Sequence, residues 1–190
     1  MRLSKGPVAA LRVRSDSCRQ APERLQRHVV GDGYGLRMAA SEEVDSLALR
    51  KARGAFFTPH ELCEFVAAWA IRSPEDTVLE PSCGEAAFLL SAGDRLTALG
   101  SNAPKLAGAE LHAASARRAR RHLATAGLTA HITTGDFFEA RPEPLYDVVI
   151  GNPPYVRYQD FTGASRAASQ RAALRAGVKL THLASSWAAF

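Results

Sequence analysis

The sequence has few cysteines, and they are not arranged as a structural site. Three are present in 190 residues, Cys18, Cys63 and Cys83, and no two of them stand close together. This spacing provides neither a disulfide framework nor a zinc ligand set, because both depend on closely spaced groups of ligands. We therefore expect free thiols and a protein without a metal site.

The sequence also lacks an apolar segment long enough to span a membrane. Its beginning does not resemble a secretory signal, since Arg12 interrupts the only apolar patch there. A content of 46% hydrophobic and 23% charged residues is ordinary for one soluble globular domain with a buried core. We expect a cytoplasmic protein with no membrane partner.

An excess of one charge sign is missing from most of the chain. Residues 54–190 contain 13 Lys or Arg against 13 Asp or Glu, whereas residues 1–53 contain 11 against 6 and so carry the whole net charge of +5. We interpret residues 1–50 as a basic leader that either contacts nucleic acid or is a solvated, partly disordered extension. Residues 51–190 are expected to be the folded part.

Regular structure is predicted from Gly54 onward. Thr58-Pro59-His60-Glu61 has the form of a capping box with proline at the first helical position, and apolar residues at helical spacing follow it. Two later helices are expected to end at glycines, and short apolar runs predict strands. The expected helices are 59–72, 86–99 and 112–126, and the expected strands are 77–80, 106–111, 130–134 and 146–151.

This alternation of strands and helices predicts an α/β fold with a parallel sheet, in which ligands bind outside the carboxyl ends of the strands. The first strand is followed by Glu80-Pro81-Ser82-Cys83-Gly84, a tight acidic turn that could wrap a nucleoside with an amino-acid tail. The second ends at Glu110, whose carboxylate either accepts the hydroxyls of a ribose or caps the next helix. After the third, Asp136 and Phe137 either contact an adenine or are a turn residue and a core residue.

The fourth strand leads into Asn152-Pro153-Pro154-Tyr155, a tetrapeptide expected by chance on the order of once in a thousand chains of this length. The Asn152 side-chain oxygen and the Pro153 carbonyl could accept the two hydrogens of a planar amino group, because a Pro-Pro step has no amide donors to close a local turn. Tyr155 offers a flat face for a base. The alternative is a strand that ends in a proline-rich turn.

Together these motifs resemble the gamma class of adenine-N6 DNA methyltransferases, which includes the Taq-like modification enzymes, over about residues 50–160. Phe56-Phe57-Thr58-Pro59 is similar to the family's amino-terminal cofactor motif. The turn after the first strand is similar to its first core motif, with Ala86 in place of a frequent second glycine. The resemblance implies that S-adenosylmethionine is bound by Phe57, Thr58, Pro59, Glu80, Pro81, Cys83, Gly84, Glu110, Asp136 and Phe137, and that Asn152, Pro153, Pro154 and Tyr155 are catalytic.

The resemblance also implies a class I methyltransferase fold, a Rossmann-like parallel sheet of seven strands, of which the sequence supplies about four. We therefore expect residues 51–190 to be the amino-terminal part of a catalytic domain, truncated before the later strands and the DNA-recognition domain. The strand at 146–151 would then be a sheet edge. On this interpretation the 190 residues alone should transfer no methyl group to DNA.

The implied function is methyl transfer from S-adenosylmethionine to the N6 amine of an adenine flipped out of double-stranded DNA. The resemblance also implies a restriction endonuclease as a partner. Two alternatives stay open: a methyltransferase for protein glutamine or RNA guanine-N2, and an inactive truncated binding module. Four arginines after the tetrapeptide could contact phosphate or form a solvated helix face. They are Arg157, Arg166, Arg171 and Arg175.

Overall fold

The computed structural model describes residues 57–140, 145–181 and 183–190. The basic leader and Phe56 therefore lie outside the described residues. The elements, in chain order, are α2 (His60–Ala70), β1 (Thr77–Glu80), α3 (Ala87–Ala98), β2 (Lys105–Glu110), α4 (Ala113–Thr125), β3 (Ala130–Thr134), the 3-10 helix η1 (Phe137–Glu139), β4 (Val148–Val149), α5 (Gly163–Arg175) and the 3-10 helix η2 (Ser186–Ala189).

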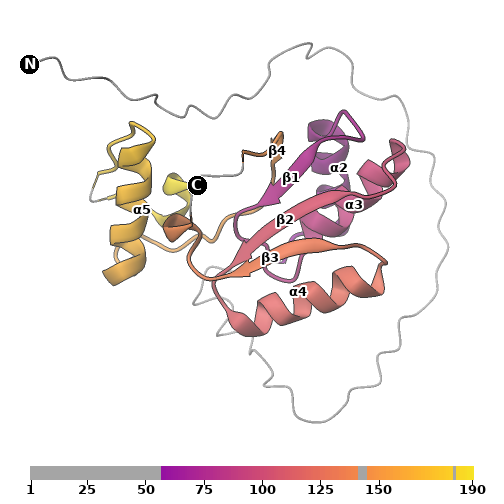
Figure 1. Cartoon of the computed structure of the whole chain (residues 1–190). Helices are drawn as coiled ribbons and strands as arrows, with labels where there is room; N and C mark the ends of the chain where they lie inside the picture. The colour runs from indigo at the N-terminus through magenta and orange to yellow at the C-terminus, as the bar shows by residue number, and fades with distance from the viewer. Residues whose placement is uncertain (1–56, 141–144, 182) are drawn as a thin grey trace, which may run out of the picture.

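The four strands form one sheet in the order β3-β2-β1-β4, and every pair of neighbours is parallel (Figure 1). This confirms the predicted parallel α/β sheet. Strands β1 and β3 have the predicted bounds, and β2 both begins and ends one residue earlier than expected. Because the strands are parallel, all four end on the same side of the sheet. We call this side, where the carboxyl ends of the strands lie, the carboxyl edge, as distinct from the lateral edges formed by β3 and β4.

Strand β4 is shorter than the predicted strand 146–151. Only Val148 and Val149 pair with β1 as a strand, although the amides of Asp147 and Ile150 also donate to the carbonyls of Thr77 and Leu79 at 3.1 and 3.0 Å. Within the described residues β4 has one neighbour and lies at the edge of the sheet, as expected. The opposite edge strand, β3, pairs with β2 over five residues, so the edge position of β4 does not by itself account for its brief pairing.

One face of the sheet is covered by α2, α3 and α4. Helix α3 packs on β1 and β2, α4 packs on β2 and β3, and α3 contacts both other helices. Both crossovers step in the same direction across the sheet, which puts their helices on the same face. The core between these layers contains large, fully buried side chains from each of them, among them Ile71, Val78, Leu89, Leu96 and Leu123.

The capping box predicted at Thr58-Pro59-His60-Glu61 is wrong. Helix α2 begins at His60 without a side-chain cap, and the Thr58 hydroxyl instead accepts a hydrogen bond from Asn152 at 3.3 Å. The apolar periodicity did predict the helix, but its buried residues are Cys63 and Ala67. Three larger apolar residues are exposed on the outer face of α2, namely Leu62, Phe65 and Trp69.

Helix α5 and η2 follow the sheet and are not part of it. Figure 1 shows α5 set apart from the three helices that cover the sheet, and it packs against η1 and η2. The Arg175 guanidinium donates to the carbonyl of Phe138 at 3.1 Å, which ties the end of α5 to η1. These elements therefore lie beside the carboxyl edge of the sheet, where β3 leads into η1.

Gly108 in the centre of β2 allows three layers to approach one another. A Cβ atom at this position would lie 3.0 Å from each of Cys83 Sγ, Leu89 Cδ1 and Ile132 Cδ1. These atoms belong to the turn after β1, to α3 and to β3, and all three residues are buried. A methyl group has no free volume here.

We therefore expect Gly108→Ala to lower the free energy of unfolding of the chain by about 1–3 kcal/mol, the usual effect of overpacking. The measurement is urea denaturation followed by circular dichroism, with an unchanged slope and a lower midpoint. An unchanged midpoint would show that the three layers are not tightly packed at this point.

Candidate functional site

The sheet brings the four predicted strand-end motifs to one edge. Glu80 and Glu110 are the last residues of β1 and β2, Asp136 follows β3, and Asn152 follows β4. With the strand order β3-β2-β1-β4, these side chains stand along the edge in the order Asp136, Glu110, Glu80, Asn152. Three carboxylates and an amide are thus collected where open parallel sheets bind ligands.

The turn after β1 is bonded to the end of β2. The Gly84 amide donates to Glu110 Oε2 at 2.9 Å, and the His112 amide donates to Glu110 Oε1 at 2.8 Å. The Cys83 amide donates to the Ala109 carbonyl at 2.9 Å. Glu110 therefore joins the turn after β1 to the loop before α4, and its bond there is to His112, which precedes the helix, and not to an amide within α4. Its buried carboxylate remains at the expected binding edge.

Ala86 occupies the place where a second glycine is frequent in the resembled motif. It has a left-handed backbone conformation, with φ 75° and ψ 29°, directly before α3. A left-handed alanine costs roughly 1–2 kcal/mol, and its fully buried methyl group in the core offsets part of this cost. The turn thus has the left-handed backbone conformation that favours glycine, although alanine occupies the position.

Glu80 is the most unusual side chain of the edge. It is 3% exposed, and its Oε2 atom has no hydrogen-bond partner among the described residues. Burial, with a smaller contribution from the Glu110 carboxylate, raises the pKa of the Glu80 carboxyl well above its usual value. Gly151 allows β4 to pass close by, since a Cβ there would lie 3.3 Å from Glu80 Cγ. A buried carboxyl oxygen without a partner is costly unless a ligand supplies one.

The two cysteines near this edge are buried free thiols. Burial, and secondarily Glu80, raises the pKa of Cys63 to about 11, and the same causes raise the pKa of Cys83 further. Burial therefore favours the thiol over the more nucleophilic thiolate at both positions. Cys18 lies outside the described residues.

At the end of β3, Asp136 and Phe137 begin η1. Asp136 Oδ1 accepts a hydrogen bond from the Phe138 amide at 2.9 Å, so this residue does cap a turn. Phe138 is buried, whereas Phe137 is half-buried. The Phe137 ring stacks against Phe190, with centroids 5.7 Å apart and planes inclined by 12°. Phe190 therefore covers part of one face of the Phe137 ring.

At the other end of the edge, Asn152 lies next to Thr58, which is 94 residues earlier in the chain. Asn152 Nδ2 donates to the buried Thr58 hydroxyl. This bond occupies the amide nitrogen and leaves the amide oxygen, Oδ1, to accept from a ligand. The amino-terminal motif and the tetrapeptide are therefore one structural unit, which neither motif shows by itself.

The rest of the tetrapeptide presents an acceptor and a ring. The Pro153 carbonyl accepts no hydrogen bond from the residues that the structure describes. The Pro154 carbonyl, in contrast, accepts one from the Ser186 hydroxyl. The Tyr155 side chain is 53% exposed. The two acceptors predicted to hold an amino group, Asn152 Oδ1 and the Pro153 carbonyl, therefore lie on consecutive residues beside an accessible aromatic ring.

Three predicted cofactor residues lie at the borders of this arrangement. Phe57 is 86% exposed, and Pro59 is exposed at the start of α2. Pro81 is half-buried, and its Cδ atom would lie 3.8 Å from a Cβ on Gly151. Pro81 is thus part of the edge, whereas no described contact joins Phe57 to the strand ends.

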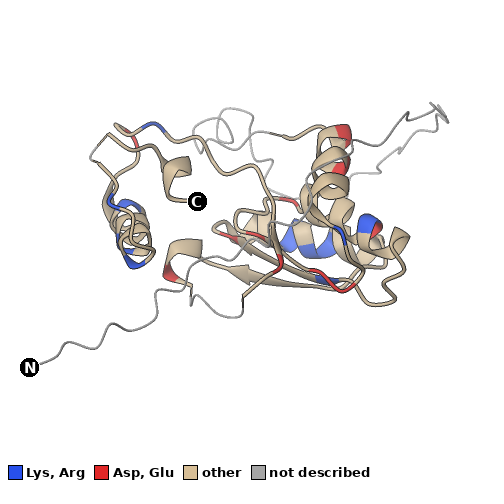
Figure 2. Cartoon of the chain, turned by 90° about the horizontal axis from the view of Figure 1, so that it is seen from above, with Lys and Arg blue, Asp and Glu red and all other residues tan. Residues whose placement is uncertain are grey.

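The arginines after the tetrapeptide mostly contact protein. Arg166 donates to the carbonyls of Tyr158 and Phe161 at 3.0 and 3.1 Å, Arg175 donates to Phe138, and Arg171 lies 3.8 Å from Glu139. These basic residues of α5 are marked blue in Figure 2. Their first role is to hold α5 and the loop before it.

Sequence reasoning missed Ser186 and Phe190. Both lie in the last described segment, more than 30 residues after the tetrapeptide, and contact Pro154 and Phe137 respectively. No spacing in the sequence marks them, since η2 is only four residues long. In the described ranges, no group of three or more His, Cys, Asp or Glu residues could hold a metal, and no helix has the length and apolar content needed to cross a membrane.

Comparison with known proteins gives consistent results. The chain is 34% identical over 149 residues to the type II methyltransferase M.PaeR7I of Pseudomonas aeruginosa, covering 63% of this chain and 26% of that protein. It is 29% identical over 133 residues to the type II methyltransferase M.XamI of Xanthomonas campestris pv. amaranthicola, covering 67% and 24%. The chain thus spans about a quarter of the length of these relatives.

Among solved structures, a modification subunit assigned to a type I restriction enzyme of Vibrio vulnificus YJ016 matches with a TM-score of 0.51 and 20% identity, over 67% of this chain and 32% of that one. This likeness supports the fold. The family model described as N-6 DNA Methylase matches residues 25–180, most of the chain and all four strand-end motifs. The chain belongs to the N-6 DNA Methylase family.

Proposed function

We propose that the carboxyl edge of the sheet binds S-adenosylmethionine and presents its methyl group to the N6 amine of a flipped adenine in double-stranded DNA. Membership of the family supports the reaction, and the match to type II methyltransferases supports a role in a restriction-modification system. The observation that carries the proposal is the order Asp136, Glu110, Glu80, Asn152 along one edge. This order places three carboxylates, which can bind a cationic ligand that carries hydroxyl groups, beside the Asn152 amide, which can accept a hydrogen from an amine.

The residues of the edge fit this cofactor. Glu80, a buried carboxyl with an unpartnered oxygen, suits the ammonium group of the methionine portion. Glu110 suits the ribose hydroxyls. To bind them, its carboxylate would give up one of the two hydrogen bonds that it accepts from the backbone amides of Gly84 and His112. The half-buried Phe137 ring, directly after β3 and Asp136, offers an aromatic contact for the adenine ring. S-adenosylmethionine, when bound, supplies a methyl group activated by a sulfonium.

The chain's own contribution to transfer is to orient the acceptor amine. The amine of adenine is a weak nucleophile because its lone pair is delocalised into the ring. Asn152 Oδ1, kept available by the bond between Nδ2 and Thr58, and the Pro153 carbonyl each accept one hydrogen of the amine. The lone pair then points out of the base plane, and Tyr155 supports the base by stacking. Orientation and charge placement supply most of the rate enhancement.

The substrate assignment rests on the relatives more than on the tetrapeptide itself, because enzymes that methylate protein glutamine also carry such a tetrapeptide. The preceding Phe57-Thr58-Pro59 and its contact with Asn152 favour a DNA enzyme. If the chain is instead an inactive binding module, it should bind S-adenosylmethionine or DNA without transferring a methyl group. We further propose that the protein acts in the cytoplasm and that a restriction endonuclease is its functional partner.

We expect Asn152→Ala in the whole protein to reduce single-turnover methyl transfer to DNA by at least 1,000-fold, with S-adenosylmethionine affinity within about threefold of wild type. The reason is that Asn152 contacts the acceptor amine, whereas the donor is held by Glu80, Glu110 and Phe137. Tritium transfer and calorimetry on the same preparations measure the two quantities.

The matched control is Asn102→Ala, which changes an exposed asparagine in the loop before β2, at the opposite end of the sheet. It should leave transfer unchanged. Duplex DNA, RNA and a glutamine-containing peptide are offered in parallel as acceptors. Wild-type labelling of RNA or peptide in preference to DNA would contradict the substrate assignment, and transfer by Asn152→Ala within tenfold of wild type would contradict the role of Asn152.

Glu80 gives a prediction about pH. Because the folded state raises the pKa of this carboxyl, its contribution to stability is fully present below the unfolded pKa of about 4.3 and is lost as pH rises toward the folded pKa. Glu80→Gln, which does not titrate, should be less sensitive to pH. The measurement is urea denaturation of both proteins between pH 4.5 and 8.

The same variant tests the cofactor contact. A cation beside Glu80 favours the carboxylate, so binding to wild type should release a proton, seen as a dependence of the binding heat on the buffer's ionisation enthalpy. Glu80→Gln should bind about 10- to 100-fold more weakly, as expected for a lost bond to a charged group, without proton release. Equal affinity and equal proton release in both proteins would remove Glu80 from the site.

A further inference from the structure

Ser186 makes three hydrogen bonds to the loop that contains Tyr155. The Val156 amide donates to Ser186 Oγ at 2.9 Å, the Ser186 hydroxyl donates to the Pro154 carbonyl, and the Ser186 amide donates to the Val156 carbonyl at 3.1 Å. Ser186 is 2% exposed. One buried residue thus binds both neighbours of Tyr155, since its amide donates a hydrogen bond and its hydroxyl both donates and accepts one.

These bonds matter because prolines deprive the loop of other anchors. Pro153 and Pro154 have no amide hydrogen, so the backbone there cannot be fixed by donating hydrogen bonds. Among the described residues, the Pro154 carbonyl and the Val156 amide are bonded only by Ser186. The backbone is therefore held on both sides of Tyr155, while the Tyr155 ring itself stays half exposed.

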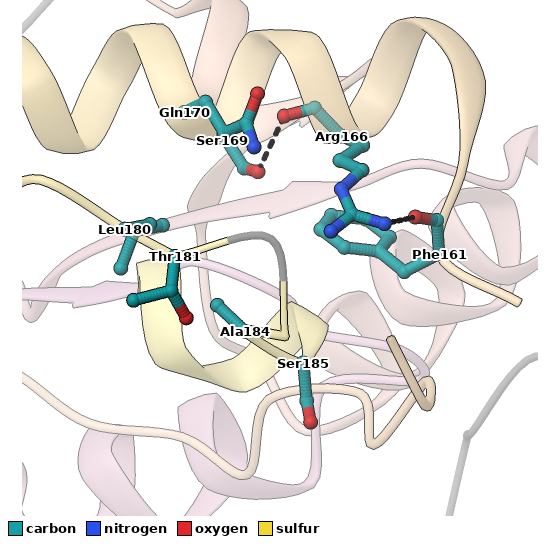
Figure 3. Close-up of a pocket in the computed structure, with 8 residues that line it drawn as sticks. All are labelled: Phe161, Arg166, Ser169, Gln170, Leu180, Thr181, Ala184 and Ser185. Carbon is teal, nitrogen blue, oxygen red and sulfur yellow. Dashed lines mark hydrogen bonds between the residues drawn. The ribbon is translucent and has the colours of Figure 1, made fainter. Parts of the chain in front are cut away.

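The element that contains Ser186, η2, packs in turn against α5. Figure 3 shows this region, a hollow bordered by Phe161, Arg166, Ser169, Ala184 and Ser185. Arg166 bonds the Phe161 carbonyl, and the buried Ser169 hydroxyl donates to the Arg166 carbonyl at 2.8 Å. These bonds fix the start of α5 to the loop after Tyr155, and α5 packs against η2, so Ser186 belongs to a supported element.

We propose that Ser186 is a positioning residue of the catalytic loop: its hydroxyl fixes the Pro154 carbonyl and the Val156 amide, and so sets the direction of Tyr155 and the placement of the Asn152 and Pro153 acceptors. It touches neither methyl donor nor base, and acts through the loop. This inference rests on the proposed function, since the loop is catalytic only if the edge transfers methyl groups. The bonding itself does not depend on that function.

The test separates the bonding from its consequence. Ser186→Ala removes both hydroxyl bonds and keeps the backbone bond to the Val156 carbonyl. Ser185→Ala, one residue earlier and with no side-chain cap bond to η2, is the control. Hydrogen exchange of the Val156 amide, relative to amides of β1 in the same sample, measures the bonding. We expect at least tenfold faster exchange at Val156 in Ser186→Ala, no change in β1, and no change at either place in Ser185→Ala.

In the whole protein, Ser186→Ala should lower the single-turnover transfer rate by about 10- to 100-fold, with S-adenosylmethionine affinity within twofold of wild type. 2-Aminopurine at the target position should show altered fluorescence, because its stacking partner Tyr155 has lost its fixed direction. A general loss of structure would weaken cofactor binding as well. If Ser186→Ala does not fold, Ser186→Cys, of similar size with a weaker donor, is expected to show the same changes at smaller amplitude.

The outcomes are distinct. Unchanged exchange at Val156 would overturn the bonding, and faster exchange with an unchanged transfer rate in an active protein would overturn the positioning role. If wild type shows slow exchange at Val156 but labels neither DNA, RNA nor peptide, the proposed function fails, and the positioning role fails with it.

Discussion

The parallel pairing of β1 with β2 on one side and β4 on the other is the constraint on which the site depends. Because all four strands run the same way, the residues that follow them must meet at one edge. The hydrogen bonds from Cys83 to Ala109 and from Gly84 to Glu110 then join neighbouring strand ends to one another. The tetrapeptide gains its position in the same way, through pairing of β4 with β1 and through the bond between Asn152 and Thr58.

This edge collects like charges, and that has a cost. Glu80, Glu110 and Asp136 lie at neighbouring strand ends, and Glu110 and Asp136 are partly compensated by backbone amides. Glu80 has no such compensation for one oxygen, and its raised pKa reflects burial beside another carboxylate. Protonation of Glu80 would relieve this repulsion, and the cationic ligand proposed for this edge would relieve it by supplying the missing partner.

The sequence was most informative about the sheet. Strands β1 and β3 could be predicted to the residue, because short apolar runs bounded by turns have few other interpretations in an alternating pattern. The prediction was less successful where long-range contacts decide. Thr58 has the local signature of a cap, but its hydroxyl bonds a residue 94 positions away, and the large apolar residues of α2 lie outside the core. Ser186 and Phe190 could not be found, since their roles arise from η2 folding back onto the loop and η1.

The most direct test of the binding edge is residue-resolved amide NMR of the chain during titration with S-adenosylmethionine. We expect saturable shifts at Gly84 and His112, whose amides bond Glu110, and at Gly135, Gly151 and Asn152. The amides of Asn102 and Gly127, at the opposite end of the sheet, should stay unchanged. Shifts confined to the Asn102 end, or none at all in a folded chain at saturating cofactor, would contradict the assignment of the carboxyl edge as the cofactor site.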